Sequence, residues 1–406
     1  MRVEKLASVF CAVAISLLFL TACGANEQNS DSKATDSTVI SESSSENEES
    51  HNMNTETAYK ATAENVKLLG RTYYETDRLY CALSGTGIEF KFTGTKCSIT
   101  VAGDSNSENS GMADNHARVG IYVNGKRVID DMVDNKDEVY EVFQSDAAQD
   151  VTVTLVKLSE SPMSTIAVTD INVTGTPIMP TSDKEKLIEF IGDSITCGYG
   201  ADDPDKNHHF STKTEDVTKA FAYKTAQALE ADYSMVSFSG YGIISGYSDG
   251  EKKVTEQALP QYYTKLGYSW AANGSFKPSE VDWDFSKRQP DIIVINLGTN
   301  DDSYTKDIKE RQEEYSTAYT EFLKTVRSKN SKAKIVCAFG IMGDRLFDSV
   351  QLAVDNYISE TGDSNVSTLR FDVQQGADGY SADWHPSVTT HDKAAKKLAD
   401  YLKTLI

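Results

Sequence analysis

The sequence predicts a chain of the α/β class, with an N-terminal β-sandwich of jelly-roll type followed by a doubly wound parallel sheet. Two observations carry this prediction. Between residues 58 and 175, short runs alternate apolar and polar residues, which is typical of antiparallel strands. From residue 187 to 406, near-continuous apolar runs alternate with helical patterns, which is typical of a parallel sheet covered on both faces. The 406-residue chain has room for both domains.

Residues 1–22 have the pattern of an export signal. Basic residues near the start precede an apolar run over residues 6–20, which is too short to span a membrane comfortably. The run ends in Leu20-Thr21-Ala22-Cys23, which resembles a bacterial lipobox. That resemblance implies a lipoprotein signal peptide, a lipidated Cys23 and a cell-surface protein anchored to the bacterial membrane. An ordinary secretory signal and an uncleaved anchor are the alternatives.

Residues 23–57 are predicted to be a disordered tether. They consist mainly of Ser, Glu, Asn, Thr and Asp, so they lack the apolar surface that would offset the entropy of ordering. The chain has a formal net charge of −21, and about a third of it comes from residues 24–59, where eight acidic residues accompany one lysine. The acidic balance argues against a nucleic-acid partner, because phosphate binding needs a basic face.

The clearest strand patterns of the first domain, 58–175, cover residues 87–92, 97–101, 117–123, 150–156 and 166–173. The Asn124-Gly125 pair is a typical hairpin turn. Such a domain either binds sugars or packs against its neighbour, and the pattern leaves both alternatives open. Residues 176–186, which include two prolines, are a predicted linker.

The second domain, 187–406, contains five strand-like runs and four helical patterns. The strands are expected at residues 187–191, 234–238, 291–297, 334–339 and 369–373, and the helices at 215–231, 306–329, 347–361 and 391–406. A long insertion, 241–285, is rich in tyrosine and glycine, and most of its aromatic residues are expected to pack the insertion down.

Polar motifs follow three of these strands and precede the last helix. They are Gly192-Asp193-Ser194, Ser239-Gly240, Gly298-Thr299-Asn300 and Asp383-Trp384-His385. Because ligands of open α/β sheets bind outside the carboxyl ends of the strands, we expect these motifs to meet in one site.

This series resembles the SGNH, or GDSL-type, hydrolase superfamily. Together with the preceding β-sandwich, the chain is similar to carbohydrate esterase family 2, and the resemblance covers the chain from about residue 60 onward. It implies an acetyl xylan esterase-like enzyme that removes O-acetyl groups from sugars or polysaccharides, and we expect a monomer without a cofactor. Tyr241, Trp270 and Trp384 are the candidate residues for stacking on sugar rings.

Ser194 is the expected nucleophile and needs a base to take its proton. His385 is the expected base because a carboxylate precedes it and a helix follows it, although His208 and His209 compete. The superfamily places an aspartate three residues before this histidine, where this chain has Ala382. Asp383 is therefore the candidate third member of a triad. The alternative is a Ser-His dyad oriented by a backbone carbonyl.

The expected oxyanion donors are the backbone N–H groups of Ser194 and Gly240 and the side-chain amide of Asn300. Asp193 is expected to fix its loop. The clustered acidic residues lack the spacing of cation ligands, so no metal is expected.

Three rival functions follow from other readings of the same motifs. They are a GDSL-type lipase or phospholipid esterase, a polysaccharide-binding protein with little hydrolysis, and a metal-dependent sugar deacetylase. The cysteines of the folded part, Cys81, Cys97, Cys197 and Cys337, are either buried free thiols or include a Cys81–Cys97 disulfide.

Overall fold

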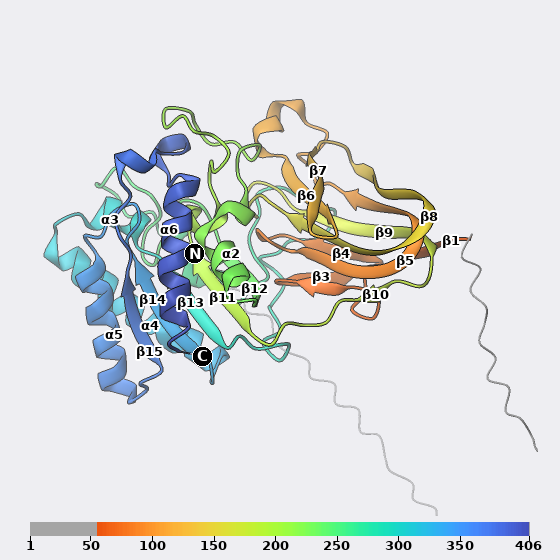
Figure 1. Ribbon diagram of the computed structural model, residues 1–406. Helices are drawn as coiled ribbons and strands as arrows, with labels where there is room; N and C mark the ends of the chain where they lie inside the picture. Colours follow the sequence, from red (N-terminus) through yellow and green to blue (C-terminus); the bar gives the residue numbers. More distant parts are fainter. Residues whose placement is uncertain (1–54, 406) are drawn as a thin grey trace, which may run out of the picture. The chain divides into compact units, whose positions relative to one another are not determined.

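The computed structural model describes residues 55–405 (Figure 1). The predicted signal peptide, Cys23 and nearly all of the predicted tether lie outside the described residues. The first strand, β1 (Glu56–Tyr59), begins two residues before the predicted start of the β-sandwich, because it pairs antiparallel with β9 (Ile166–Gly175).

The N-terminal domain is an antiparallel ten-stranded sheet that curls on itself (Figure 1). Its strand order is β3-β4-β9-β5-β8-β6-β7, with β1 on β9 and both β2 and β10 on β5. The remaining strands are β2 (Lys67–Leu69), β3 (Thr72–Glu75), β4 (Arg78–Cys81), β5 (Gly87–Ala102), β6 (Ala117–Val123), β7 (Lys126–Val133), β8 (Asp137–Lys157) and β10 (Met179–Pro180). Register shifts between Gly94 and Lys96 and between Cys97 and Ser98 allow β5 to bend. The predicted linker contains β10.

The C-terminal domain is built on five parallel strands. They are β11 (Leu187–Gly192), β12 (Asp232–Ser237), β13 (Ile292–Asn296), β14 (Lys334–Phe339) and β15 (Val366–Arg370). Their order is β12-β11-β13-β14-β15, so the chain leaves β11 on one side and returns on its other side at β13. The loops after these strands therefore flank the topological switch point where α/β folds place their ligands.

Helices cover both faces of this sheet, as the sequence predicts for a doubly wound fold. On one face, Phe190 packs in a core with residues of α2 (Phe221–Ala228) and α6 (Val388–Leu402). On the other, Ile191 packs with residues of α4 (Lys309–Lys329) and α5 (Phe347–Thr361). No helix within residues 55–405 is both long and apolar enough to cross a membrane.

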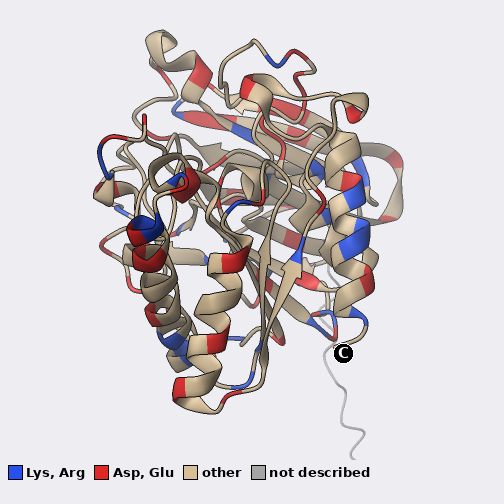
Figure 2. Ribbon diagram, turned by 90° about the vertical axis from the view of Figure 1, so that its left-hand side faces the viewer, with Lys and Arg blue, Asp and Glu red and all other residues tan. Residues whose placement is uncertain are grey.

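Charged side chains connect the two domains. Arg71, which is fully buried, donates from Nη2 to both oxygens of Glu189 on β11 at 3.0 Å. Arg127 of β7 lies 2.9 Å from the buried Asp216 carboxylate. Elsewhere, basic and acidic residues are interspersed along the helices of the C-terminal domain (Figure 2), as in the 2.7 Å pair between Lys324 of α4 and Glu360 of α5.

Candidate active site

Ser194 lies at the carboxyl end of the central strand β11. The strand ends at Gly192, where a Cβ atom would lie 2.0 Å from the Thr196 hydroxyl, so only glycine fits this turn. Asp193 then caps the short helix α1 (Ser194–Cys197) by accepting from the Ile195 N–H at 3.0 Å. The serine side chain is thereby held at the start of a helix and at the edge of the sheet.

His385 reaches Ser194 from the loop before α6. Its Nε2 atom lies 2.9 Å from the Ser194 hydroxyl, and its Nδ1 atom lies 3.1 Å from the Ala382 carbonyl oxygen. Burial lowers the pKa of His385 to about 4, while the Ala382 carbonyl and the charge of Asp383 oppose that shift. The imidazole is therefore neutral near pH 7, which is the form that can accept a proton from serine.

Asp383 does not contact the imidazole of His385 as a triad acid does. Its Oδ2 accepts from the Tyr199 hydroxyl at 2.6 Å, and its Oδ1 faces Nδ1 of His209 at 2.9 Å. The reason is local backbone geometry, because Asp383 and Trp384 have left-handed φ values of 49° and 63°. This turn leaves the Ala382 carbonyl, instead of the Asp383 carboxylate, facing Nδ1. The geometry agrees with the dyad alternative.

Tyr199 is a site residue that lies outside the sequence motifs. Its ring stacks on the imidazole of His385 with 3.8 Å between ring centroids and an interplanar angle of 15°. It comes two residues after the glycine-capped helix α1, so the loop that follows the serine also supports the histidine. The competing histidines lie outside this pair: His208 binds Asp203, and the exposed His209 binds Asp383.

The predicted oxyanion donors lie in the segments that follow neighbouring strands of the sheet. In the register of the sheet, Gly192 of β11 pairs with Ser237 of β12 and with Asn296 of β13. Gly240 follows β12 with a φ of 82°, a conformation that favours glycine. Within residues 55–405, the backbone N–H groups of Ser194 and Gly240 donate to no protein acceptor, so both remain available to a substrate.

Asn300 lies in α3 (Thr299–Thr305) and is buried. Its amide donates one hydrogen bond to the Tyr241 carbonyl at 2.8 Å, which leaves its second N–H for another acceptor. The adjacent Asp301 accepts from the N–H groups of Ile243, Ile244 and Ser245 at 2.7–3.1 Å. The loops after β12 and β13 are thus tied to each other.

The three candidate sugar-stacking residues differ in exposure. Trp270 and Trp384 are exposed by 58% and 50%, and both present surface to solvent. Tyr241 is only 2% exposed, because its ring packs against Phe238 and Tyr262 in the core. Tyr241 is therefore a packing residue, in contrast to the prediction that it stacks on sugar.

Other aromatic residues of the insertion also pack against the fold, as expected. Tyr263 is fully buried, and Tyr262 and Tyr268 are partly buried against the same core. The four cysteines of the described residues, Cys81, Cys97, Cys197 and Cys337, are buried free thiols, which is the first of the two alternatives that the sequence left open.

Two family models match the chain. Residues 190–393, about half of the chain, match the GDSL-like Lipase/Acylhydrolase family, and residues 68–181 match the Carbohydrate esterase 2 N-terminal domain. The chain belongs to the GDSL-like lipase/acylhydrolase family. The order of the two matched regions is the combination that the sequence motifs predict.

Known proteins are similar to this chain over most of its length. The Cellulase/esterase CelE of Acetivibrio thermocellus is 32% identical over 328 residues, which cover 80% of this chain and 37% of CelE. An acetylxylan esterase / glucomannan deacetylase of Cellvibrio japonicus is 25% identical over 354 residues, which cover 85% of this chain and 90% of that protein. The structure of a family two carbohydrate esterase from Clostridium thermocellum, in complex with cellohexaose, matches with a TM-score of 0.72 and 28% identity, and the match covers 84% of this chain and 98% of that one.

Proposed function

We propose that the protein is a serine esterase that removes O-acetyl groups from sugars or polysaccharides through an acetyl-enzyme intermediate. The observation that carries this proposal is the 2.9 Å contact between Ser194 Oγ and His385 Nε2. Among the described residues, the backbone N–H groups of Ser194 and Gly240 have no protein acceptor and are available to an oxyanion. The relative named as an acetylxylan esterase / glucomannan deacetylase supports an acetylated carbohydrate as the substrate. We also propose that the curled N-terminal sheet is a β-sandwich domain of jelly-roll type.

Each side chain has a defined task in the proposed reaction. Ser194 Oγ attacks the acetyl carbonyl carbon and gives its proton to Nε2 of His385. Before this step the neutral imidazole carries its single proton on Nδ1, which faces the Ala382 carbonyl, so the Nε2 lone pair faces the serine. The oxyanion accepts hydrogen bonds from Ser194, Gly240 and Asn300. His385 then protonates the departing sugar oxygen and activates the water that releases acetate.

Trp270 and Trp384 are the proposed platforms for sugar rings. Both are exposed, and Trp384 is adjacent to His385 in the chain. The ammonium group of Lys206 lies 3.8 Å from the centre of the Trp384 ring, so a sugar would have to displace it from that face or use the other face. The complex of the family two esterase with cellohexaose supports a chain of several sugar units as the ligand.

Release of acetate tests this proposal. We would incubate acetylated xylan, acetylated glucomannan, 4-nitrophenyl acetate and phospholipid vesicles with the wild type, with Ser194→Ala and with chelator-treated wild type. We expect acetate release by the wild type and by the chelator-treated protein, and none by Ser194→Ala. Faster hydrolysis of phospholipid would favour the lipase alternative. Binding of xylan without acetate release would favour the binding protein, and loss of activity with chelator would favour the metal-dependent deacetylase.

We further propose that the protein is a surface-anchored lipoprotein modified at Cys23. The lipobox-like Leu20-Thr21-Ala22-Cys23 supports this proposal. Labelling with a radioactive fatty acid in a bacterial host should mark the wild type and leave Cys23→Ala unlabelled. Equal labelling of both proteins would contradict it.

A further inference from the structure

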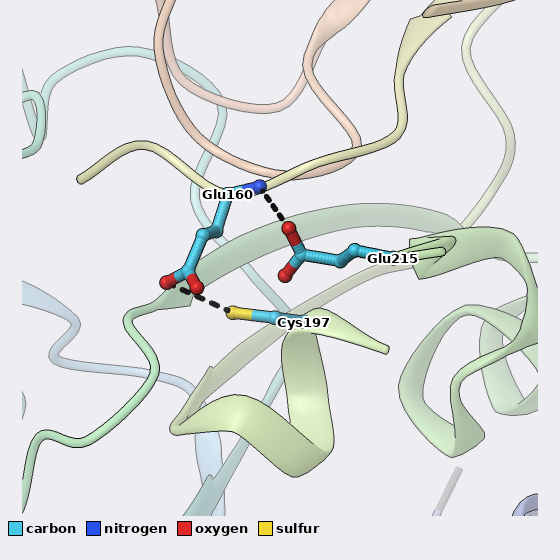
Figure 3. A group of neighbouring side chains, drawn as sticks. All are labelled: Glu160, Cys197 and Glu215. Carbon is cyan, nitrogen blue, oxygen red and sulfur yellow. Dashed lines mark hydrogen bonds between the residues drawn. The ribbon is translucent and has the colours of Figure 1, made fainter. Parts of the chain in front are cut away.

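A buried group of side chains that the proposed mechanism does not use lies where the two domains meet. Glu160, Cys197 and Glu215 are fully buried, and one oxygen or sulfur atom of each lies within 4.8 Å of the others (Figure 3). Glu160 belongs to the loop after β8 of the N-terminal domain, whereas Cys197 ends the helix that begins with Ser194. Through Glu160, the N-terminal domain therefore lies next to the helix that carries the nucleophile.

Glu160 is fixed by hydrogen bonds to the C-terminal domain through both its main chain and its side chain. Its N–H donates to Oε2 of Glu215 at 2.9 Å (Figure 3). Its own Oε2 accepts from the backbone N–H of Ser239 at 2.7 Å. Ser239 directly precedes Gly240, so the carboxylate holds the peptide group next to the one that supplies the Gly240 N–H.

We propose that Glu160 is a positioning residue for the oxyanion hole, and that the N-terminal domain is thereby part of the catalytic centre. The proposal rests on the esterase function proposed above. By holding the Ser239 N–H, Glu160 restricts the rotation that would turn the Gly240 N–H away from the developing oxyanion. Because a misplacement of about 1 Å can reduce a rate by about 100-fold, this restraint matters for the reaction.

The hydrogen bonds favour positioning over cation binding. One oxygen of each glutamate already accepts a backbone N–H. Burial raises the pKa of the Cys197 thiol well above its usual range, and a protonated thiol is a poor metal ligand. The buried ammonium of Lys157, which donates to the carbonyls of Ser159 at 2.7 Å and Glu160 at 3.0 Å, supplies positive charge from the protein itself.

Substitutions at Glu160 test the proposal with 4-nitrophenyl acetate and acetylated xylan as substrates. We expect Glu160→Ala to lower kcat by about 10- to 100-fold with KM changed less than about threefold, because an oxyanion donor acts in the transition state. Glu160→Gln should retain kcat within about threefold, since its carbonyl oxygen can still accept from Ser239.

Lys67→Met is the matched control. Lys67 is also buried and also links the two domains, with Nζ 2.7 Å from Asp232, but Asp232 begins β12 at the end of the sheet away from Ser239. We expect this variant to lower the melting temperature without changing kcat. An equal loss of kcat in Glu160→Ala and Lys67→Met would overturn the positioning role, because it would show a general effect of the interface.

A double-mutant cycle with Asn300→Ala separates the two explanations further. Donors that stabilise one oxyanion act as a unit, so the losses from Glu160→Ala and Asn300→Ala should be less than additive. Fully additive losses would overturn the proposal. If Glu160→Ala does not fold, Glu160→Asp replaces it, and full kcat in that folded variant would overturn the proposal equally. A wild type that hydrolyses neither substrate would instead reject the esterase function.

Discussion

The histidine side and the oxyanion side of the candidate site are held in place by different kinds of contact. His385 is held by the carbonyl of its own loop, three residues away, and by the ring of Tyr199. The nearby carboxylate of Asp383 is partly exposed. On the oxyanion side, the carboxylates of Glu160 and Asp301 are fully buried and accept hydrogen bonds from four backbone N–H groups.

This difference indicates where substitutions have large effects. An exposed carboxylate near a charged partner contributes little to stability, because water screens its charge. A buried carboxylate can accept hydrogen bonds from several N–H groups. Removing it leaves each of these groups unsatisfied, which costs about 1–3 kcal/mol of stability for each group. Substitutions on the oxyanion side should therefore have larger effects than substitution of Asp383 near the histidine.

The largest effect is expected when the nucleophile or its base is removed, because both sides of the site act on this pair. Ser194→Ala and His385→Ala should each lower kcat for 4-nitrophenyl acetate by about 10⁴- to 10⁶-fold, because the nucleophile and its base act as a unit. Unchanged melting temperatures would serve as the control for folding. A residual rate within tenfold of the wild type in either variant would contradict the Ser-His assignment.

Asn300→Ala tests the oxyanion side directly. We expect kcat to fall by about 10²- to 10³-fold with little change in KM, since the amide acts on the charge of the transition state. Steady-state kinetics with acetylated xylan measures both constants. A change confined to KM would mean that Asn300 binds the substrate in its ground state instead.

Asp301→Asn tests the buried carboxylate that ties the two oxyanion loops together. Both oxygens of the carboxylate accept hydrogen bonds from the three backbone N–H groups. In asparagine one oxygen is replaced by an NH₂ group, a donor that would face at least one of these donors. We expect a loss of about 1–3 kcal/mol in the free energy of unfolding, measured by urea denaturation. A variant as stable as the wild type would show that the loops are held by other contacts.

The pH dependence of kcat/KM tests the histidine side. The pKa of His385 is lowered from 6.5 to about 4, so the neutral base persists at pH 6 and is lost only as the pH falls toward 4. We expect the acidic limb of kcat/KM below about pH 5 instead of near 6.5. The unfolded chain gains this proton near pH 6.5, so protonation also destabilises the fold between pH 6.5 and 4. An acidic limb of kcat/KM centred near pH 6.5 would show that burial does not lower the pKa of His385.

Asp383→Ala has the smallest expected effect. Loss of a triad aspartate typically costs about 10⁴-fold in kcat. Within residues 55–405 the Asp383 carboxylate hydrogen-bonds to Tyr199 and His209 instead of His385, so its loss should cost less than about tenfold. Asp383→Asn should shift the acidic limb to slightly lower pH, because the charge of Asp383 raises the pKa of His385. A loss of 10³-fold or more would restore Asp383 as the third member of a triad.

Several parts of the fold and site could be predicted because they leave a local pattern. The strand runs and the Gly192-Asp193-Ser194 turn are continuous in the chain, and the order of motifs placed Ser194 beside His385. The first turn of the predicted helix 306–329 was wrong, because Lys306 has a φ of 46° and α4 begins at Lys309. The last strand begins at Val366, three residues before the predicted start, because pairing with β14 sets its register.

Other contacts of the site leave no local pattern. The Ala382 carbonyl is a backbone group, and any residue type at that position offers it. Tyr199 and Glu160 act through stacking and a hydrogen bond across 186 and 79 positions of sequence, which only the folded chain brings together. The burial of Tyr241 also depends on rings that lie elsewhere in the insertion.

The hydrogen bonds around Arg71 have a consequence for how the protein is assembled. This arginine sits among the rings of Tyr263, Trp283 and Phe285 and donates to Glu189 on the central strand. During synthesis the N-terminal domain leaves the ribosome first, so Arg71 emerges before every one of these partners. The later domain then packs around an arginine of the earlier one, and replacing the N-terminal domain by one that lacks this arginine would leave Glu189 without its buried charged partner.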